Sequence, residues 1–308
     1  MKHLVFSVVA AALLHSAVLP ATLGQAQPAR VFVAAQGSDG NPCTFAMPCR
    51  SFQHAHDTVA AGGEIDVLDP AGYGIVTITK SISIQGHGFA GVAAPSGTTA
   101  VTISAGAGDK VNLRGLLLDG VGSGSTGIGF NTGASLNVQD CLIRNSGTGI
   151  NFRPVMGGSL FVADTLVADN ISGIEFSTPG SAPVSGALDH VRIENHSSNG
   201  LTVRGTLGTG PIAVTVSDSV IANQGTGVGV SAGLGTAVVM VRSSTIANSA
   251  TGIGVNHAGA TARVARSTIT GNNLGWTAVD GATLSSYGDN NVDGNTTDGT
   301  PTNTITTK

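Results

Sequence analysis

The chain has 308 residues, of which 45 are Gly, 10% are charged and 4% are aromatic. Soluble domains usually carry about 25% charged residues, and Gly disfavours helix interiors, so this composition excludes a helical bundle. The formal net charge of −4 leaves no basic surface for a phosphate backbone, so we expect no nucleic-acid partner.

The first 26 residues have the pattern of an export signal. A short polar start precedes an apolar run from Leu4 to Leu19, and Gly24-Gln25-Ala26 offers small residues for cleavage. A membrane anchor is the alternative, but the run is short for a span of about 20 residues and lacks charged flanks. We predict a signal peptide at 1–26, a periplasmic or extracellular protein, and no membrane span in the mature chain.

Residues 27–89 are predicted to form an N-terminal cap and the first strands. Cys43 and Cys49 lie six residues apart. In an exported protein we expect them to form a disulfide, with two reduced thiols as the alternative. Ser51 is placed to cap a short helix, and "EIDVLD" and "GIVTITKSISIQG" have the alternation of strands. His54 and His56 are two residues apart on that helix and point to different faces, so a metal pair is not expected there.

A repeat fills residues 90–295. Its copies include "SLNVQDCLIRNSGTGINF", "SLFVADTLVADNISGIEF", "VTVSDSVIANQGTGVGV" and "VVMVRSSTIANSATGIGV". Each copy alternates apolar and polar residues with period two, which is typical of strands, and leaves no room for a crossover helix. A coil that winds once per repeat, with each strand pairing in parallel about 4.8 Å above its equivalent, fits this pattern.

Equivalent positions in the copies predict the register of the coils. One apolar column is Ile150, Ile174, Leu201, Val228, Ile253 and Trp276; a second is Val138, Val162, Leu188, Val216, Val241 and Val264; a third is Ile143, Val167, Ile193, Ile221, Ile246 and Ile269. We expect these columns to stack into one continuous core, with Trp276 filling it near the C-terminal end. Cys141 has the parity of an inward position, which predicts a buried, inert side chain rather than a nucleophile.

Two further columns are interpreted as structural. A stacked amide column consists of Asn145, Asp169 or Asn170, Asn195, Asn223, Asn248 and Asn272. A glycine column consists of Gly149, Gly173, Gly200, Gly227, Gly252 and Gly275, and is predicted to supply a positive φ at a corner. The polar residues 296–308 are predicted to form a tail that is partly unstructured.

Taken together, these copies resemble the right-handed parallel β-helix repeat of the pectin-lyase-like superfamily. The segment "GSDGNPCTFAMPCRSF" is similar to one that precedes the first coil in a group of bacterial exported β-helix proteins. The resemblance covers roughly Arg30 to Asn295. It implies an all-β, single-stranded right-handed parallel β-helix with a short N-terminal capping helix. The superfamily includes lyases, hydrolases, epimerases, phage tail spikes and adhesins, so the fold does not choose the activity.

Gly86-His87-Gly88 resembles part of the active-site signature of polygalacturonases in that superfamily. In those enzymes an Asn-x-Asp motif and an Asp-Asp pair precede it, and their carboxylates act as acid and base across the scissile bond. An Arg-x-Lys motif follows it. This sequence contains no Asp-Asp pair, and no Arg-x-Lys follows. We interpret His87 as a polar residue in a glycine-rich turn.

The bend column is the best set of candidate catalytic residues: Asp140, Asp164, His190 and Asp218. Asp140 and Asp164 would stack about 5 Å apart and could share a proton or a cation. The alternative is that an Asp at a bend caps a turn amide. We expect no cofactor and no dedicated metal site. If the bend carboxylates hold an ion, calcium is the one that they would suit.

Three arginines are candidate ligand-binding residues for acidic sugars: Arg153, Arg192 and Arg204. Arg153 and Arg204 follow the Gly-apolar strand at equivalent positions two coils apart. Solvated surface side chains are the alternative.

Two classes of function remain open. The first, which we favour, is an exported non-catalytic scaffold or interaction module that binds polysaccharide or cell-surface components. The second is an enzyme acting on acidic polysaccharide, a lyase or an epimerase, that uses Asp140, Asp164 and nearby Arg or His residues.

Overall fold

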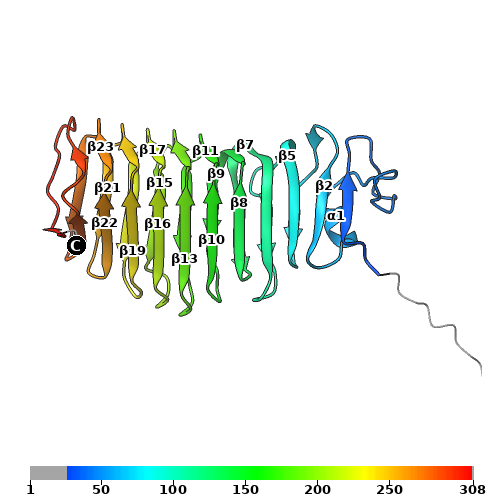
Figure 1. The fold of residues 1–308 in the computed structure, drawn as a ribbon, viewed down its shortest axis with the longest axis horizontal. Coiled ribbons are helices and arrows are strands. Elements are labelled where there is room, and N and C mark those ends of the chain that lie inside the picture. The colour runs from blue at the N-terminus through cyan, green and yellow to red at the C-terminus, as the bar shows by residue number, and fades with distance from the viewer. Residues whose placement is uncertain (1–25, 307–308) are drawn as a thin grey trace, which may run out of the picture.

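A computed structural model describes residues 26–306. The predicted signal peptide therefore lies almost entirely outside the described residues. The described chain winds into a stack of coils, and the strands stand side by side along its length (Figure 1). All strand pairings are parallel, and each strand pairs with its equivalent in the next coil. The predicted fold class, an all-β parallel β-helix with very little helix, is confirmed.

Each coil contributes one strand to each of three parallel ladders, which we call sheets A, B and C in chain order. Sheet A contains β1 (Arg30–Val33), β2 (Gly63–Val67), the starts of β5 (Ile82–Ala93) and β7 (Lys110–Thr132), β8 (Ser135–Gln139), β10 (Gly158–Ala163), β13 (Val184–Asp189), β16 (Ile212–Ser217), β19 (Ala237–Arg242), β22 (Ala260–Ala265), β25 (Thr283–Ser286) and β27 (Asn303–Thr304).

Sheet B is built from the shortest strands. It contains β3 (Ala71–Gly72), the end of β5, the middle of β7, the start of β9 (Leu142–Phe152), β11 (Leu166–Ala168), β14 (Arg192–Glu194), β17 (Val220–Ala222), β20 (Thr245–Ala247), β23 (Thr268–Thr270) and β26 (Asn291–Val292). Sheet C contains β4 (Val76–Ile78), β6 (Thr99–Ser104), the ends of β7 and β9, β12 (Ser172–Ser177), β15 (Asn199–Gly205), β18 (Thr226–Ala232), β21 (Thr251–Asn256) and β24 (Leu274–Val279).

The predicted register is confirmed in all three apolar columns. Ile150, Val138 and Ile143 each pair with the residue expected in the next coil. The members of these columns are buried, and Trp276 is only 5% exposed. The alternation of apolar and polar residues therefore fixes which face of every strand enters the core.

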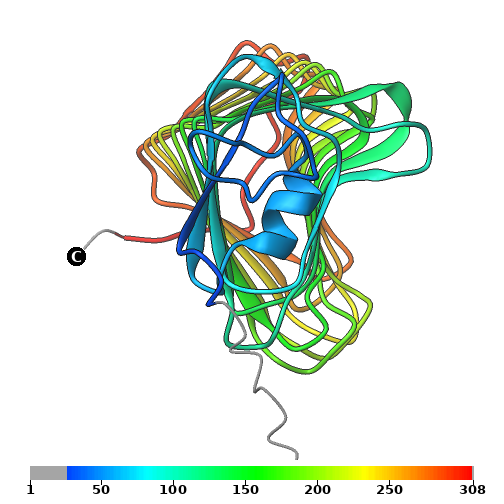
Figure 2. The ribbon, with the colours of Figure 1, turned by 90° about the vertical axis from the view of Figure 1, so that its right-hand side faces the viewer.

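The N-terminal end of the stack is covered by α1 (Phe52–Thr58), which lies across the coils in the end view (Figure 2). Ser51 is the N-cap, and its Oγ accepts a hydrogen bond from the backbone N–H of His54. Phe52 and Ala55 are fully buried, and the Phe52 ring contacts that of Tyr73 at 5.2 Å between centroids. This cover protects the unpaired edge that an open stack would otherwise expose.

The other end of the stack differs from the prediction of a partly unstructured tail. β27 pairs with β25, and Thr297 forms a parallel bridge with Leu274. Thr302 donates its Oγ1–H to the Leu284 carbonyl and accepts the Leu284 N–H. Within residues 296–306, these bonds satisfy backbone groups at the last coil edge.

The glycine column does not supply positive φ, so this prediction is wrong. Gly252 is typical: it has an ordinary φ, but a Cβ there would lie 2.3 Å from the Gly275 carbonyl oxygen of the next coil. Close approach of neighbouring coils, not a left-handed backbone, therefore requires glycine at this position.

The left-handed positions lie instead at the two bends of each coil. The bend between sheets A and B has φ of 53° at Asp140 and 49° at Asp164; the bend between sheets B and C has φ of 54° at Asn145 and 61° at Asn195. Asp and Asn tolerate this region better than other residues with a Cβ. The turn interpretation of both polar columns thus has a backbone cause.

Buried polar side chains stack just inside each bend. Next to the first bend, Cys141 N–H donates to Thr165 Oγ1, and the ladder continues through Ser219, Ser244 and Ser267. Cys141 is 4% exposed, and burial raises the pKa of its thiol to about 11. It is therefore a buried and protonated member of a hydrogen-bonded ladder.

The predicted amide column divides into two at the second bend. Asn223 Nδ2 donates to Asn195 Oδ1 at 3.1 Å, as a stacked amide column requires, and a separate buried ladder lies just inside the bend. Asn170 and Asn272 belong to it, and each accepts a backbone N–H from the preceding coil, at 2.8 and 2.9 Å. Asn145, Asn195, Asn223 and Asn248 precede this column and occupy the left-handed bend. His196 and Gln224 continue the buried ladder, but His196 Nε2 and both amide atoms of Gln224 have no partner among the described residues.

Candidate functional site

The predicted bend residues lie in one row. Asp140, Asp164, His190 and Asp218 follow β8, β10, β13 and β16, and all have left-handed backbone conformations. Their backbone N–H groups donate to carbonyls of the next coil, as Asp164 does to Asp189 at 3.3 Å. This geometry accounts for the residue types without any ligand.

The bend side chains pair with neighbours rather than with one another. Asp140 Oδ2 accepts a 2.8 Å hydrogen bond from Arg114 Nε. His190 Nδ1 lies 3.2 Å from Asp189 Oδ2, and the hydrogen bond with Asp189 raises the pKa of His190. The structure therefore brings Asp140 together with an arginine of the preceding coil, which the sequence interpretation missed.

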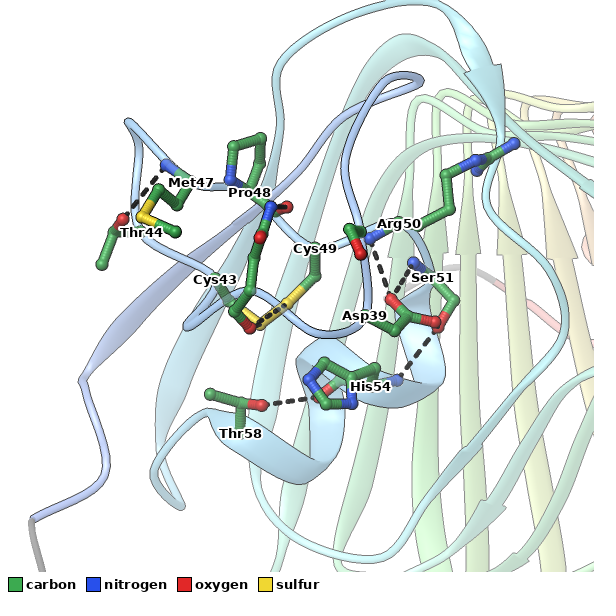
Figure 3. The surroundings of a disulfide bond; sticks show 12 residues. Asp39, Cys43, Thr44, Met47, Pro48, Cys49, Arg50, Ser51, His54 and Thr58 are labelled. Atoms are coloured by element: carbon green, nitrogen blue, oxygen red, sulfur yellow. Dashed lines mark hydrogen bonds between the residues drawn. A yellow bond between two sulfur atoms is a disulfide. The ribbon is translucent and has the colours of Figure 1, made fainter.

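One group of side chains in residues 26–306 has at least three metal-binding atoms close enough to share an ion: Cys43, Cys49 and His54, with all three atoms within 4.8 Å of one another. Cys43 and Cys49, however, are joined by a disulfide bond, so neither sulfur is a thiolate ligand. Asp39 braces this segment, because its carboxylate accepts the backbone N–H of Arg50 and of Ser51 at 2.9 Å (Figure 3). The arrangement supports a structural role for the segment.

The three candidate arginines do not form one patch. Arg192 lies on sheet B and bonds Glu194 at 2.9 Å. Arg204 lies on sheet C, where its Nη1 is 3.3 Å from Glu175 Oε1. Arg153 directly follows the last residue of β9, on the same side of the molecule as Arg204. Sheet C thus combines two of the three.

A shallow groove of about 310 Å³ runs along the outer face of sheet C. Its middle column reads Thr202, Gly229, Gly254 and Thr277 in successive coils, so two missing side chains form the floor. Hydroxyl, amide and guanidinium groups line it: Asn199, Thr202, Arg204, Thr226, Ser231, Thr251, Asn256 and Thr277. The groove offers many hydrogen-bonding groups and one cation paired with Glu175.

A second hollow, of about 410 Å³, lies on sheet A over β8, β10 and β13. Its lining contains Asn137 and Phe161 but no charged side chain: Asn112, Ser135, Leu136, Asn137, Ser159, Leu160, Phe161, Ser185, Gly186 and Ala187. Nothing in this lining would orient an ionic ligand.

A third cavity, of about 460 Å³, lies at the first coils and contains charged groups. Gln85, His87, Arg114 and Asp140 line it together with Gly88 and Gly115. His87 Nε2 lies 2.6 Å from Asp66 Oδ1. His87 has φ of 54°, in agreement with the turn interpretation, but the sequence did not indicate its partners Asp66 and Arg114.

The sequence signal for this cavity is a length difference. Gln85 pairs with Arg114 and Ala90 pairs with Leu116, so four residues, 86–89, stand opposite the single Gly115. The later bends between sheets A and B have no such insertion, although β7 has one at its bend between sheets B and C, where residues 120–125 stand opposite residues 145–147. A search for the copy with extra residues, rather than for a catalytic motif, would have found the site.

No family model matches the sequence, and no curated protein matches it either. Among solved structures, pectate lyase Pel9A is similar with a TM-score of 0.58 and 14% identity, over 83% of this chain and 74% of the other. The A-module of the Azotobacter vinelandii mannuronan C-5 epimerase AlgE6 has a TM-score of 0.52 and 14% identity, over 82% and 92%. ORF18 of Geobacillus virus E2 has a TM-score of 0.54 and 12% identity, over 89% and 60%.

At these identities the likeness concerns the fold alone. The resemblance stated from the repeats is confirmed at that level: this chain has the parallel β-helix fold of the pectin-lyase-like proteins.

Proposed function

We propose that this chain is an exported, non-catalytic protein that binds polysaccharide along the groove on sheet C. The observation that carries the proposal is the groove itself, with its floor of Gly229 and Gly254 and its rows of hydroxyl and amide groups. Coils repeat along the stack, so an extended polymer meets similar groups at each coil. Such a surface suits a ligand that is itself a chain of hydroxyl-bearing units.

Two of the similar folds carry names of enzymes that act on pectate and mannuronan, which supports a polysaccharide as the ligand class. Arg204, which lines this groove, favours polymers with carboxylates. No helix in residues 26–306 is long and apolar enough to cross a membrane. Export itself rests on the N-terminal sequence pattern.

The enzymatic alternative receives less support from the site. Its candidate carboxylates, Asp140 and Asp164, occupy left-handed bend positions, and Asp140 is already paired with Arg114. Catalysis needs an acid and a base aimed at one reacting bond. A non-catalytic role requires only the groove.

Filling the groove tests the proposal. A Cβ at Gly254 would contact Thr251 Cγ2 at 3.7 Å and Thr226 Cγ2 at 3.9 Å, which are ordinary packing distances. Gly254→Leu therefore adds bulk to the floor without a backbone clash. Thr215→Leu is the matched control, because it adds a similar side chain to an exposed position of sheet A.

Binding would be measured by gel-shift or calorimetry with polygalacturonate, mannuronan and neutral dextran, alongside an assay for chain cleavage or epimerisation. We expect Gly254→Leu to weaken polymer binding about tenfold or more, which corresponds to roughly 1.4 kcal/mol, and Thr215→Leu to leave it unchanged. Turnover of either uronan, or equal binding by both variants, would overturn the proposal.

A further inference from the structure

The cavity at the first coils lies at a bend between sheets A and B that is longer than every later bend between these two sheets. The inserted residues 86–89 bulge from the bend of β5, and this bulge carries His87 outward beside the next two coils. Asp66 comes from β2, His87 from β5, Arg114 from β7, and Asp140 follows β8. Three consecutive coils therefore place one ionisable group each around a single hollow, and Asp66 of the coil before them holds His87.

The charged groups of this cavity are held in two pairs. Asp66 Oδ1 holds His87 Nε2 at 2.6 Å, and Asp140 Oδ2 holds Arg114 Nε at 2.8 Å. Asp66 itself has only 18% of its side chain exposed, and Arg30 Nη2 lies 3.9 Å from its Oδ2. These contacts fix the orientation of the imidazole and of the guanidinium before any ligand arrives, which reduces the entropy lost on binding.

The pairing leaves several polar atoms of the cavity without a partner in residues 26–306. These atoms are the two Nη nitrogens of Arg114, Oδ1 of Asp140 and the side-chain amide atoms of Gln85. A guanidinium edge with two parallel N–H groups matches a carboxylate in a bidentate geometry. Asp140 Oδ1 beside it is an acceptor and suits a hydroxyl donor.

We propose that this cavity is a binding site for a small carboxylate that carries a neighbouring hydroxyl group. The carboxylate lies against the free edge of Arg114, the hydroxyl donates to Asp140 Oδ1, and His87 and Gln85 close the other side. The volume of about 460 Å³ falls within the range of about 300–1,000 Å³ typical of small-ligand sites. The site lies at the bend between sheets A and B, away from the groove on sheet C, and does not depend on the function proposed for that groove.

Two sources supply this chemistry: a uronic-acid sugar and a free hydroxy acid. The test uses NMR of the histidine side chains of the full exported chain, with the His87 resonances assigned through His87→Gln. Galacturonate, glycolate, acetate and glucose are titrated separately. We expect galacturonate or glycolate to shift the His87 resonances, while acetate binds more weakly and glucose causes no shift. Tighter binding of galacturonate would identify a uronic-acid sugar as the source, and tighter binding of glycolate a free hydroxy acid.

Arg114→Gln should weaken binding about tenfold or more, because it removes a charge-assisted bidentate contact. Arg114→Lys keeps the charge but not the two parallel N–H groups. Its affinity should therefore lie between those of the wild-type protein and of Arg114→Gln. Arg263→Gln is the matched control, since Arg263 is an exposed arginine on β22 of the same sheet. The stability of each variant is checked by urea unfolding, and exposed ion pairs of this kind contribute little to stability.

Three results would overturn the proposal. The His87 resonances could fail to respond to any carboxylate, Arg114→Gln could bind as tightly as Arg263→Gln, or acetate could bind as tightly as both hydroxy acids. Gly254→Leu should leave the His87 response intact, so failure at this site and failure at the sheet C groove are distinguishable.

Discussion

The coils from β8 onward and the coils from β2 to β7 use the same polar residue types for different purposes. In the later coils, a bend residue such as Asp164 adopts a left-handed backbone, and its side chain has no hydrogen-bond partner in the described part of the chain. In the first coils, His87 pairs with Asp66, and Arg114 pairs with Asp140 at the boundary with the later coils, so that three of these side chains line a cavity. At the bends, repetition therefore marks residues that build the stack, whereas departure from the repeat marks residues that can meet a small ligand.

The physical reason lies in what each coil must satisfy. Every regular coil needs two left-handed bends, an inward glycine, and polar side chains that accept the backbone N–H groups of the coil before it. Those demands fix residue types at fixed positions. The insertion at 86–89 releases one bend from them, and a side chain at that bend is held by Asp66 instead of by the repeat.

The largest expected effect separates two glycines. Gly252→Ala should destabilise the protein by about 3 kcal/mol, because its Cβ would lie 2.3 Å from the Gly275 carbonyl oxygen. Gly88→Ala should cost only about 1 kcal/mol, since its φ is +82° but no atom lies within 4 Å of the added Cβ. Urea unfolding of both variants measures the difference, and equal losses would contradict the distinction between the regular and the irregular coil.

The disulfide gives the next largest effect. Replacing both Cys43 and Cys49 by Ala should cost about 2 kcal/mol, the loss expected for a short closed loop. Cys141→Ser is the control and should be nearly neutral, because Ser219 and Ser244 fill the same buried column. Since coils contact only their neighbours, hydrogen exchange should rise mainly near α1 and β1. Faster exchange throughout β8–β26 would show instead that the cap stabilises the whole stack.

The sequence predicts the repeating part of the fold in detail. Period-two alternation placed Val138, Ile143 and Ile150 in three separate ladders, and each pairs as expected. The role of the glycines was wrong because composition does not distinguish a left-handed position from a close contact; Gly252 is required by the carbonyl of Gly275, which lies 23 residues further along the chain.

The site was less accessible to sequence reasoning for a related reason. Asp140 was identified, but its partner Arg114 lies one coil earlier, and His87 and Asp66 lie earlier still. These contacts depend on where an irregular coil sets its bulge, which no repeat predicts. A copy-by-copy comparison of lengths would locate the bulge but not its partners.

A smaller effect is expected from pH, and it distinguishes a buried histidine from an exposed one. Burial lowers the pKa of His196, whose Nδ1 accepts the Asn170 N–H. The unfolded chain then binds a proton more readily than the folded chain, so stability is retained above about pH 6.5 and is lost as the pH falls below it. His190 has a raised pKa and contributes in the opposite direction, with its stability lost as the pH rises.

The measurement is the midpoint of thermal unfolding between about pH 5 and pH 8, the range in which histidine titrates. His196→Asn should flatten the acid limb, because Asn170 and Asn272 already fill equivalent positions in the same ladder. If the unfolding midpoint of His196→Asn falls as steeply at acid pH as that of the wild-type protein, the loss of stability belongs to other titrating groups.

The smallest effect tests whether the bend column has only a backbone role. Asp164→Ala should cost about 1 kcal/mol, because alanine is less tolerant of a left-handed backbone. Asp164→Asn should leave the stability nearly unchanged, since Asn fills the equivalent left-handed position at the other bend. If Asp140 and Asp164 instead shared a calcium ion, Asp164→Asn would be as harmful as Asp164→Ala, and added calcium would stabilise the native protein but neither variant. Urea unfolding with calcium and with a chelator therefore shows whether this bend requires a residue that tolerates a left-handed backbone or a carboxylate that binds an ion.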